Sequence, residues 1–401
     1  MSFLEEKLCP GKMTHPWRMD LAVTALLAGV CALLLPGWNL GEGSGFTNFQ
    51  AQMAGAMLLP AMGMVLAMRR GAIDLGVWGV MALGGAVAAT LINAGWLPAA
   101  AFITAIGVGA VLGLVNGVCS AWGRVPSPLV TLLVAAGALW ATHWLAGGGE
   151  AIVIPEFTFE AWKANVMDLV QTGPEEERNL HGLPVVLLTR MLFVAGCWAV
   201  VMLALVLVSG WEAGSGTPRT RRVGLAIALA ASGALAAAGG AAWLIDYGST
   251  PVPAALVGDL RIPAAAVLSG ALVCGASGRV MLAGVWLPVA LLAATMWRQQ
   301  TFYFDAGGYE LQLAVLTGEV LLAQWAMRRR LSSPARPTLL NLAVAAGLAG
   351  LAVFAASGWT FRPTVRGGMQ CASLALAAGA CVLLVADVVL NRRARRRAHA
   401  G

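Results

Sequence analysis

Residues 99–121 read AAAFITAIGVGAVLGLVNGVCSA, and this stretch contains no charged side chain. Apolar runs of about 18 or more residues are long enough to cross a bilayer as a helix. Backbone amides inside hydrocarbon must be satisfied within the protein, and a helix satisfies them within its own segment. The stretch therefore predicts a transmembrane helix.

The rest of the chain repeats this pattern. Of 401 residues, 59% are apolar and 11% are charged, and the mean hydropathy is +0.77. Soluble domains carry about 25% charged residues. We therefore predict an all-α polytopic membrane protein with about twelve transmembrane helices. The predicted spans are 20–37, 51–68, 72–94, 99–121, 127–146, 187–209, 223–245, 259–275, 279–297, 311–328, 338–357 and 368–390. The 259–275 run is short and glycine-rich, which fits a broken or re-entrant helix as well as a plain span.

The distribution of Lys and Arg orients these spans. If the N-terminus is cytoplasmic, 19 of the 26 basic residues fall on the cytoplasmic side, as the positive-inside rule expects, and the C-terminus is cytoplasmic too. The basic residues sit at the ends of apolar runs, so the net charge of +7 indicates membrane orientation and not nucleic-acid binding. The cytoplasmic set is Lys7, Lys12, Arg18, Arg69, Arg70, Arg124, Arg219, Arg221, Arg222, Arg279, Arg328, Arg329, Arg330, Arg336, Arg392, Arg393, Arg395, Arg396 and Arg397.

Four regions follow from these boundaries. Residues 1–19 form a cytoplasmic tail, and residues 20–330 form a ten-span core. The core includes an acidic external loop, 147–183. This loop holds either an amphipathic helix that lies on the membrane surface or against a partner, or an acidic solvated stretch with one packed helix. Residues 331–390 add a C-terminal helical hairpin, and residues 391–401 form a basic cytoplasmic tail.

No catalytic arrangement is visible. The four histidines are scattered, and the seven cysteines show no CxxC or Cys/His spacing, so we expect neither a metal site nor a cofactor. No Walker A sequence is present, so this chain does not bind ATP in the P-loop manner. We expect a protein that is not an enzyme.

Gly109, Gly113 and Gly117 lie four residues apart on one face of the 99–121 span. Small residues at this spacing allow the backbones of two membrane helices to approach closely. We therefore assign these three glycines to helix packing.

Four polar residues within predicted spans are candidates for a translocation path: Asp74, Asn116, Thr131 and Glu319. Ionisable groups in membrane spans are costly and are often functional. Asp74 could instead pair with the arginines at 69–70, whereas Glu319 lies mid-span without a nearby cation in sequence. Asn116 and Thr131 could equally form hydrogen bonds between helices.

Several segments resemble, in order, the motifs of ribose-type ABC transporter permeases. Residues 71–78, GAIDLGVW, resemble that family's G-G-I-D-L-S-V-G; residues 113–117, GLVNG, resemble G-L-x-N-G; and residues 124–132, RVPSPLVTL, resemble R-I-P-P-F-I-V-T-L. Shorter matches lie at 81–83, 147–148, 277–279, Gly284, Gln312 and Gly318.

This resemblance implies an inner-membrane permease subunit in a bacterium. Two such subunits, identical or different, would form the path for a sugar or similar small solute. Separate ABC ATPase subunits would drive it, and a periplasmic solute-binding protein would deliver substrate to the 147–183 side.

The chain departs from the family at the cytoplasmic coupling segment. The corresponding 209–222 stretch is short, and its candidate ATPase-coupling loop holds Glu212, Arg219, Arg221 and Arg222. Gly76 and Trp78 also replace the family's Ser and Gly. Two alternatives therefore stay open: a degenerate permease fold that acts as a scaffold subunit, and a proton- or ion-coupled carrier that uses Glu319.

Overall fold

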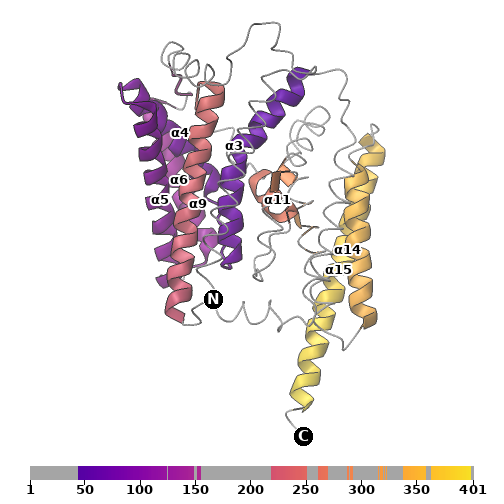
Figure 1. The fold of residues 1–401 in the computed structure, drawn as a ribbon. Helices are drawn as coiled ribbons and strands as arrows, with labels where there is room; N and C mark the ends of the chain where they lie inside the picture. Colours follow the sequence, from indigo (N-terminus) through magenta and orange to yellow (C-terminus); the bar gives the residue numbers. More distant parts are fainter. Residues whose placement is uncertain are drawn as a thin grey trace, which may run out of the picture.

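The computed structural model describes residues 44–123, 125–148, 151–154, 218–250, 261–269, 337–357 and 363–398, with short helical pieces between 287 and 322. Nearly all of these residues are helical (Figure 1). The named helices are α3 Ser44–Arg69, α4 Val77–Asn93, α5 Pro98–Trp122, α6 Ser127–Leu145, α9 Pro218–Tyr247, α11 Arg261–Leu268, α14 Pro337–Ser357 and α15 Pro363–Ala398.

The described helices have the length and surface of membrane helices. Three stretches are long and apolar enough to cross a bilayer: Pro98–Trp122, Ser127–Leu145 and Arg222–Ile245. Helices α5 and α6 also expose bulky apolar side chains, including Ile103, Leu133 and Trp140. Such a surface suits hydrocarbon and not water. The chain is therefore a helical membrane protein, and the total of twelve spans and the location of both termini stay predictions.

Helices α5, α6 and α14 match their predicted spans to within one residue at both ends, whereas α3, α9 and α15 begin at least five residues earlier than predicted. Helix α4 begins at Val77 and not at residue 72, because residues 70–76 leave the helical path. Within the predicted 259–275 run, the described residues form the helix α11, which has eight residues, or about 12 Å, and is followed by a turn at Ser269. The predicted spans 20–37 and 187–209, and most of 279–297 and 311–328, lie outside the described residues.

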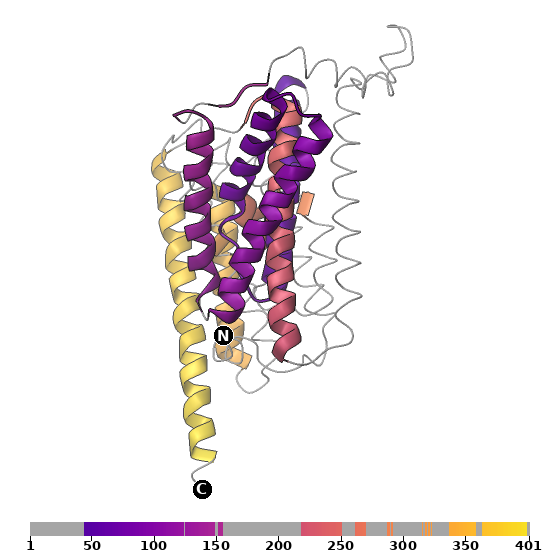
Figure 2. The ribbon, with the colours of Figure 1, turned by 90° about the vertical axis from the view of Figure 1, so that its left-hand side faces the viewer.

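Helix α9 is the centre of the described bundle, since α3, α4 and α5 all pack against it (Figures 1 and 2). Glycines make these contacts close. A methyl group at Gly84 of α4 would overlap Ala237, and one at Gly63 of α3 would lie 2.8 Å from the Ser232 Cα. The glycine face of α5 predicted from sequence packs on the same helix, as described below.

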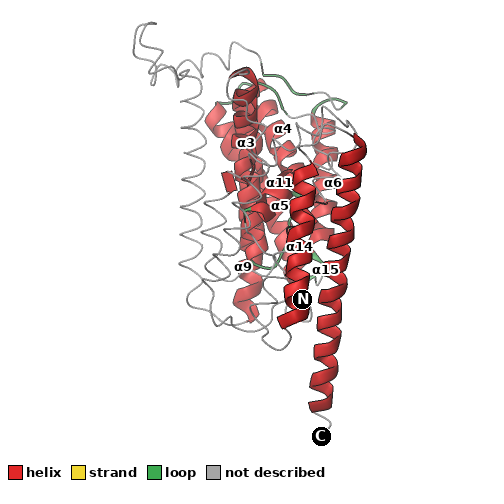
Figure 3. Ribbon diagram, turned by 90° about the vertical axis from the view of Figure 1, so that its right-hand side faces the viewer, coloured by secondary structure: helices red, strands yellow, loops and turns green. Residues whose placement is uncertain are grey.

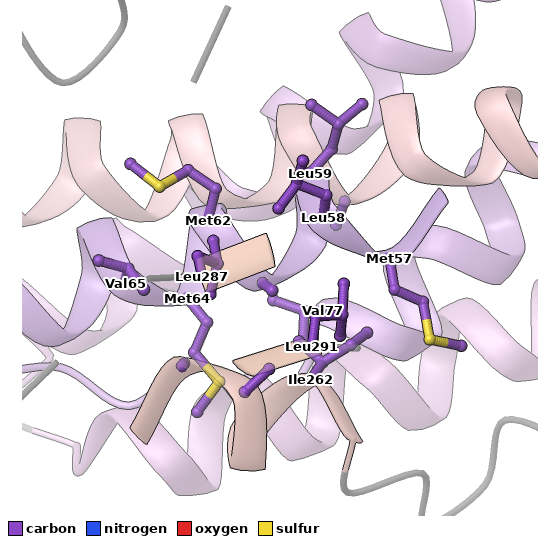
Figure 4. Close-up of a cluster of buried hydrophobic side chains, with 14 of the residues drawn as sticks. Met57, Leu58, Leu59, Met62, Met64, Val65, Val77, Ile262, Leu287 and Leu291 are labelled. Carbon is purple, nitrogen blue, oxygen red and sulfur yellow. The ribbon is translucent and has the colours of Figure 1, made fainter. Parts of the chain in front are cut away.

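A cluster rich in methionine fills the space between α3 and α11 (Figure 4). Met57, Met62 and Met64 of α3 are buried there with Ile262 of α11. All eight residues of α11 are buried, including Arg261, which is only 2% exposed. The short helix thus lies within the protein interior.

At one end of the bundle, residues 151–154 are tied to the residues that follow α9. Ile154 N donates to the Gly248 carbonyl over 2.9 Å, and Thr250 N donates to the Ile152 carbonyl over 3.0 Å. Asn93 Nδ2, at the end of α4, donates to the Val153 carbonyl over 3.1 Å. The start of the predicted external loop is therefore anchored to α4 and α9.

Helices α14 and α15 pack against each other as a hairpin (Figure 3). Their positions match the predicted spans 338–357 and 368–390. Helix α15 is longer than predicted, because it continues through the basic tail to Ala398.

Candidate functional site

The segment that joins α3 to α4 turns back into the bundle. Ala72 N donates to the Ala67 carbonyl over 3.1 Å, which closes the end of α3. Gly71 has φ +78°, a conformation that glycine adopts without the steric cost other residues meet. The turn directs Ile73, Asp74 and Leu75 between α6 and α9.

The backbone of this segment is held by hydroxyl groups from the first turns of α6. Ile73 N donates to Ser127 Oγ over 3.2 Å, and Leu75 N donates to Thr131 Oγ1 over 3.1 Å. The Thr131 hydroxyl itself donates to the Pro128 carbonyl over 3.2 Å, so its oxygen is free to accept from Leu75. Two side chains of α6 thus replace the partners that a helix would have given these amides.

Asp74 connects the same segment to α9. Its Oδ2 accepts a hydrogen bond from Ser232 Oγ over 2.7 Å, and its Oδ1 accepts one from Gly76 N over 3.0 Å. The side chain is 2% exposed and Ser232 is fully buried. The carboxylate is therefore held by a hydroxyl and an amide. Arg70 also lies against Gly224 of α9, where an added methyl group would come within 2.8 Å of its guanidinium.

Gly76 allows the segment to approach α6. A methyl group on Gly76 would lie 2.7 Å from the Thr131 carbonyl oxygen and 3.2 Å from Asp74 Oδ1. Any larger side chain would push the segment away from α6. This explains physically why glycine stands where the resembling family has serine.

Two of the four path candidates therefore meet at one site, because Asp74 and Thr131 hold the same short segment. Asn116 lies on α5 and is 1% exposed, and its Oδ1 has no hydrogen-bond partner. Ser120, one turn further along, also has a buried hydroxyl without a partner. No described contact joins Asn116 to the Asp74 site, and Glu319 lies outside the described residues.

The predicted coupling loop needs a correction. Helix α9 begins at Pro218, so Arg219, Arg221 and Arg222 belong to its first turns and not to a loop. Proline at a first helical position is favoured, which explains the start. Glu212 lies outside the described residues.

Sequence reasoning did not identify three residues that the structure makes prominent. Ser127 and Ser232 bind the 73–75 segment, and Arg261 is a buried cation in the interior. Ser127 lies in the 124–132 segment, so the family resemblance was a possible signal. Ser232 is the single hydroxyl residue in the alanine-rich stretch 223–246 of α9 and carries no local signal.

The arrangement connects two helices through one short segment. The described residues contain no group of three His, Cys, Asp or Glu side chains that could hold a metal ion. The 73–75 segment instead links α6 to α9 through three side-chain hydroxyls. Any shift of α6 against α9 must either move this segment or break one of these hydrogen bonds.

Comparison with known proteins gives one partial similarity. The chain is 31% identical over 112 residues to the autoinducer 2 import system permease protein LsrC of Escherichia coli O9:H4 (strain HS) and, equally, of Escherichia coli (strain ATCC 8739). The matched part is 27% of this chain, and it spans only about a third of the relatives' length (33%). No family model matches the chain, and no solved structure matches it significantly.

Proposed function

We propose that this protein is a transmembrane permease subunit of an importer for a sugar or a similar small solute. A separate ATPase subunit would supply the energy, and a second permease subunit would complete the path. A periplasmic binding protein would deliver the solute at the outer surface of a bacterial inner membrane.

The single observation that carries the proposal is the meeting of two family-like segments at one site. Residues 71–78 and 124–132 are separate in sequence, yet Ser127 and Thr131 bind the amides of Ile73 and Leu75. If the two segments resembled the family by chance, there would be no reason for Ser127 and Thr131 in one to hydrogen-bond to the backbone of the other. The partial similarity to an import-system permease agrees with the same proposal.

The start of α9 suggests where an ATPase would bind. Arg219, Arg221 and Arg222 are helical, because α9 begins at Pro218. In this proposal the ATPase contacts the first turns of α9. Those turns are coupled to the 70–76 segment by the packing of Arg70 on Gly224.

The test is purification of the full-length tagged protein in mild detergent, with mass spectrometry of the proteins that accompany it. We expect an ABC ATPase in near-equal amount. The triple variant Arg219→Gln, Arg221→Gln, Arg222→Gln should lose the ATPase, whereas the matched variant Arg328→Gln, Arg329→Gln, Arg330→Gln should keep it. Recovery of other membrane proteins without any ATPase would refute the proposal.

A second candidate is a scaffold subunit that keeps a permease fold without ATP-driven transport. The observation that favours it is the early start of α9 at Pro218, because the helix occupies part of the place expected for a coupling segment. The same purification separates the two candidates, since a scaffold would retain membrane partners and no ATPase.

A further inference from the structure

The C-terminal helix is longer than a bilayer needs. Helix α15 has 36 residues, which corresponds to about 54 Å, whereas the hydrocarbon core of a bilayer is about 30 Å thick. Figures 1 and 3 show its last part extending beyond the ends of the neighbouring helices. The additional length must therefore lie outside the hydrocarbon.

The packing of α14 on α15 locates the point where this extension begins. Ala343 of α14 and Leu384 of α15 are buried in one cluster. Gly350 approaches Ser373 and Leu376, so the two helices run antiparallel. The first residue of α14 is Pro337, six residues before Ala343. Because the helices are antiparallel, Pro337 is level with about the residue six positions after Leu384, which is Leu390. Residues 391–398 therefore have no α14 residue beside them.

This extension carries a dense positive charge. Residues 391–398 read NRRARRRA and contain five arginines within a six-residue stretch. At a rise of 1.5 Å per residue, the backbone positions of these arginines lie about 3 to 11 Å beyond Leu390. The predicted span 368–390 and the packing on α14 both end at about Leu390, and we take this as the edge of the hydrocarbon. The headgroup layer on each side of a bilayer is about 5 to 8 Å thick, so the arginines then fall at its depth or at its aqueous edge.

We propose that residues 391–398 bind the headgroups of anionic phospholipids in the leaflet at this end of the protein. Clusters of four to eight basic residues directly beyond a membrane helix attract anionic lipids, because the lipid phosphates neutralise the charge. Arginine is suited to this contact, since its planar guanidinium can bind two phosphate oxygens at once. A rigid helical connection to the hairpin would let bound lipids hold α14 and α15 at a set depth.

The test measures lipid binding to the purified full-length protein by native mass spectrometry, with phosphatidylglycerol and phosphatidylcholine as probes in the same detergent. We expect preferential binding of phosphatidylglycerol. Replacing all five arginines by glutamine (R392Q, R393Q, R395Q, R396Q, R397Q) should weaken it about tenfold or more. The variant R328Q, R329Q, R330Q, R336Q, which removes four arginines spread over nine residues before α14, should weaken it less than the five-arginine variant does.

Folding of the five-glutamine variant is checked by size-exclusion chromatography and helical circular dichroism. Both should stay unchanged, because the substitutions lie beyond the end of α14. Unchanged phosphatidylglycerol binding in this variant would overturn the proposal. So would loss of a co-purifying acidic protein without any change in lipid binding, which would assign the arginines to a protein partner.

Discussion

Asp74 shows how a buried acidic side chain is held between membrane helices by hydrogen bonds from a hydroxyl and a backbone amide. Its two oxygens accept hydrogen bonds from Ser232 and Gly76, and its backbone neighbours Ile73 and Leu75 are bound from the opposite side. Leaving a buried polar group without its partner costs about 1–3 kcal/mol. Each of these bonds can therefore be tested by a single substitution.

Ser232→Ala should lower the free energy of unfolding by about 1–3 kcal/mol, because Asp74 Oδ2 loses its donor inside the protein. Ser269→Ala is the matched control. Ser269 is equally buried, but among the described residues its hydroxyl donates to the Ala266 carbonyl in the last turn of the preceding helix α11. Thermal or denaturant unfolding in detergent measures both, and equal losses for the two variants would contradict the assigned role of Ser232.

Thr131→Val should destabilise the protein by about 1–3 kcal/mol, since the Leu75 amide would lose its acceptor while the side-chain volume is kept. Thr131→Ser should retain most of the stability, because the accepting oxygen remains. A control on the same helix is Thr142→Val, since that hydroxyl donates only to the Ala138 carbonyl one turn earlier. If Thr131→Val and Thr142→Val lowered the free energy of unfolding equally, the hydrogen bond to the Leu75 amide would not contribute to stability.

At the level of elements, α9 is held by helices that approach it closely. Methyl groups at Gly109, Gly113 and Gly117 of α5 would overlap Gly233, Leu229 and Ala226 of α9. The glycine spacing predicted close packing but could not name the partner helix. The structure shows that the partner is α9, more than 100 residues further along the chain.

Gly113→Ala should destabilise the protein by about 1–3 kcal/mol, because the added methyl group meets the Leu229 backbone, which has no rotamer to change. Gly107→Ala, on the same helix, meets nothing within 4 Å. It should be neutral or stabilise by up to about 1 kcal/mol, since alanine favours the helix. The unfolding midpoints of the Gly113→Ala and Gly107→Ala variants test this contact. Similar midpoints would refute the close approach of α5 to α9.

For the whole molecule, the distribution of Lys and Arg predicts which ends of the helices face the cytoplasm. Leu97, 76% exposed between α4 and α5, lies at the end predicted to be external. Ala398, the last residue of α15, lies at the end predicted to be cytoplasmic.

Two single-cysteine proteins, Leu97→Cys and Ala398→Cys, test this orientation after the native cysteines are replaced by serine. A membrane-impermeant maleimide should label Leu97→Cys in intact cells, and it should label Ala398→Cys only after the membrane is opened. The reverse result would invert the orientation derived from the positive-inside rule.

The helices themselves were largely readable from sequence. Hydrophobicity is a local property, so the runs at 99–121, 127–146 and 338–357 predicted α5, α6 and α14 to within one residue at each end. Irregular backbone was harder to predict. The shift of the start of α4 to Val77 depends on partners from α6, and no local pattern marks it.

The sequence indicated that Asp74 and Thr131 were unusual in a membrane span, because a polar group in hydrocarbon is costly wherever its partner lies. The sequence could not show which residue binds each of these polar groups. Ser232 is 158 residues from Asp74, and Thr131 is 56 residues from Leu75. Such pairs exist only once helices from different parts of the chain pack together, so tertiary structure alone decided that α6, α9 and the 73–75 segment form one site.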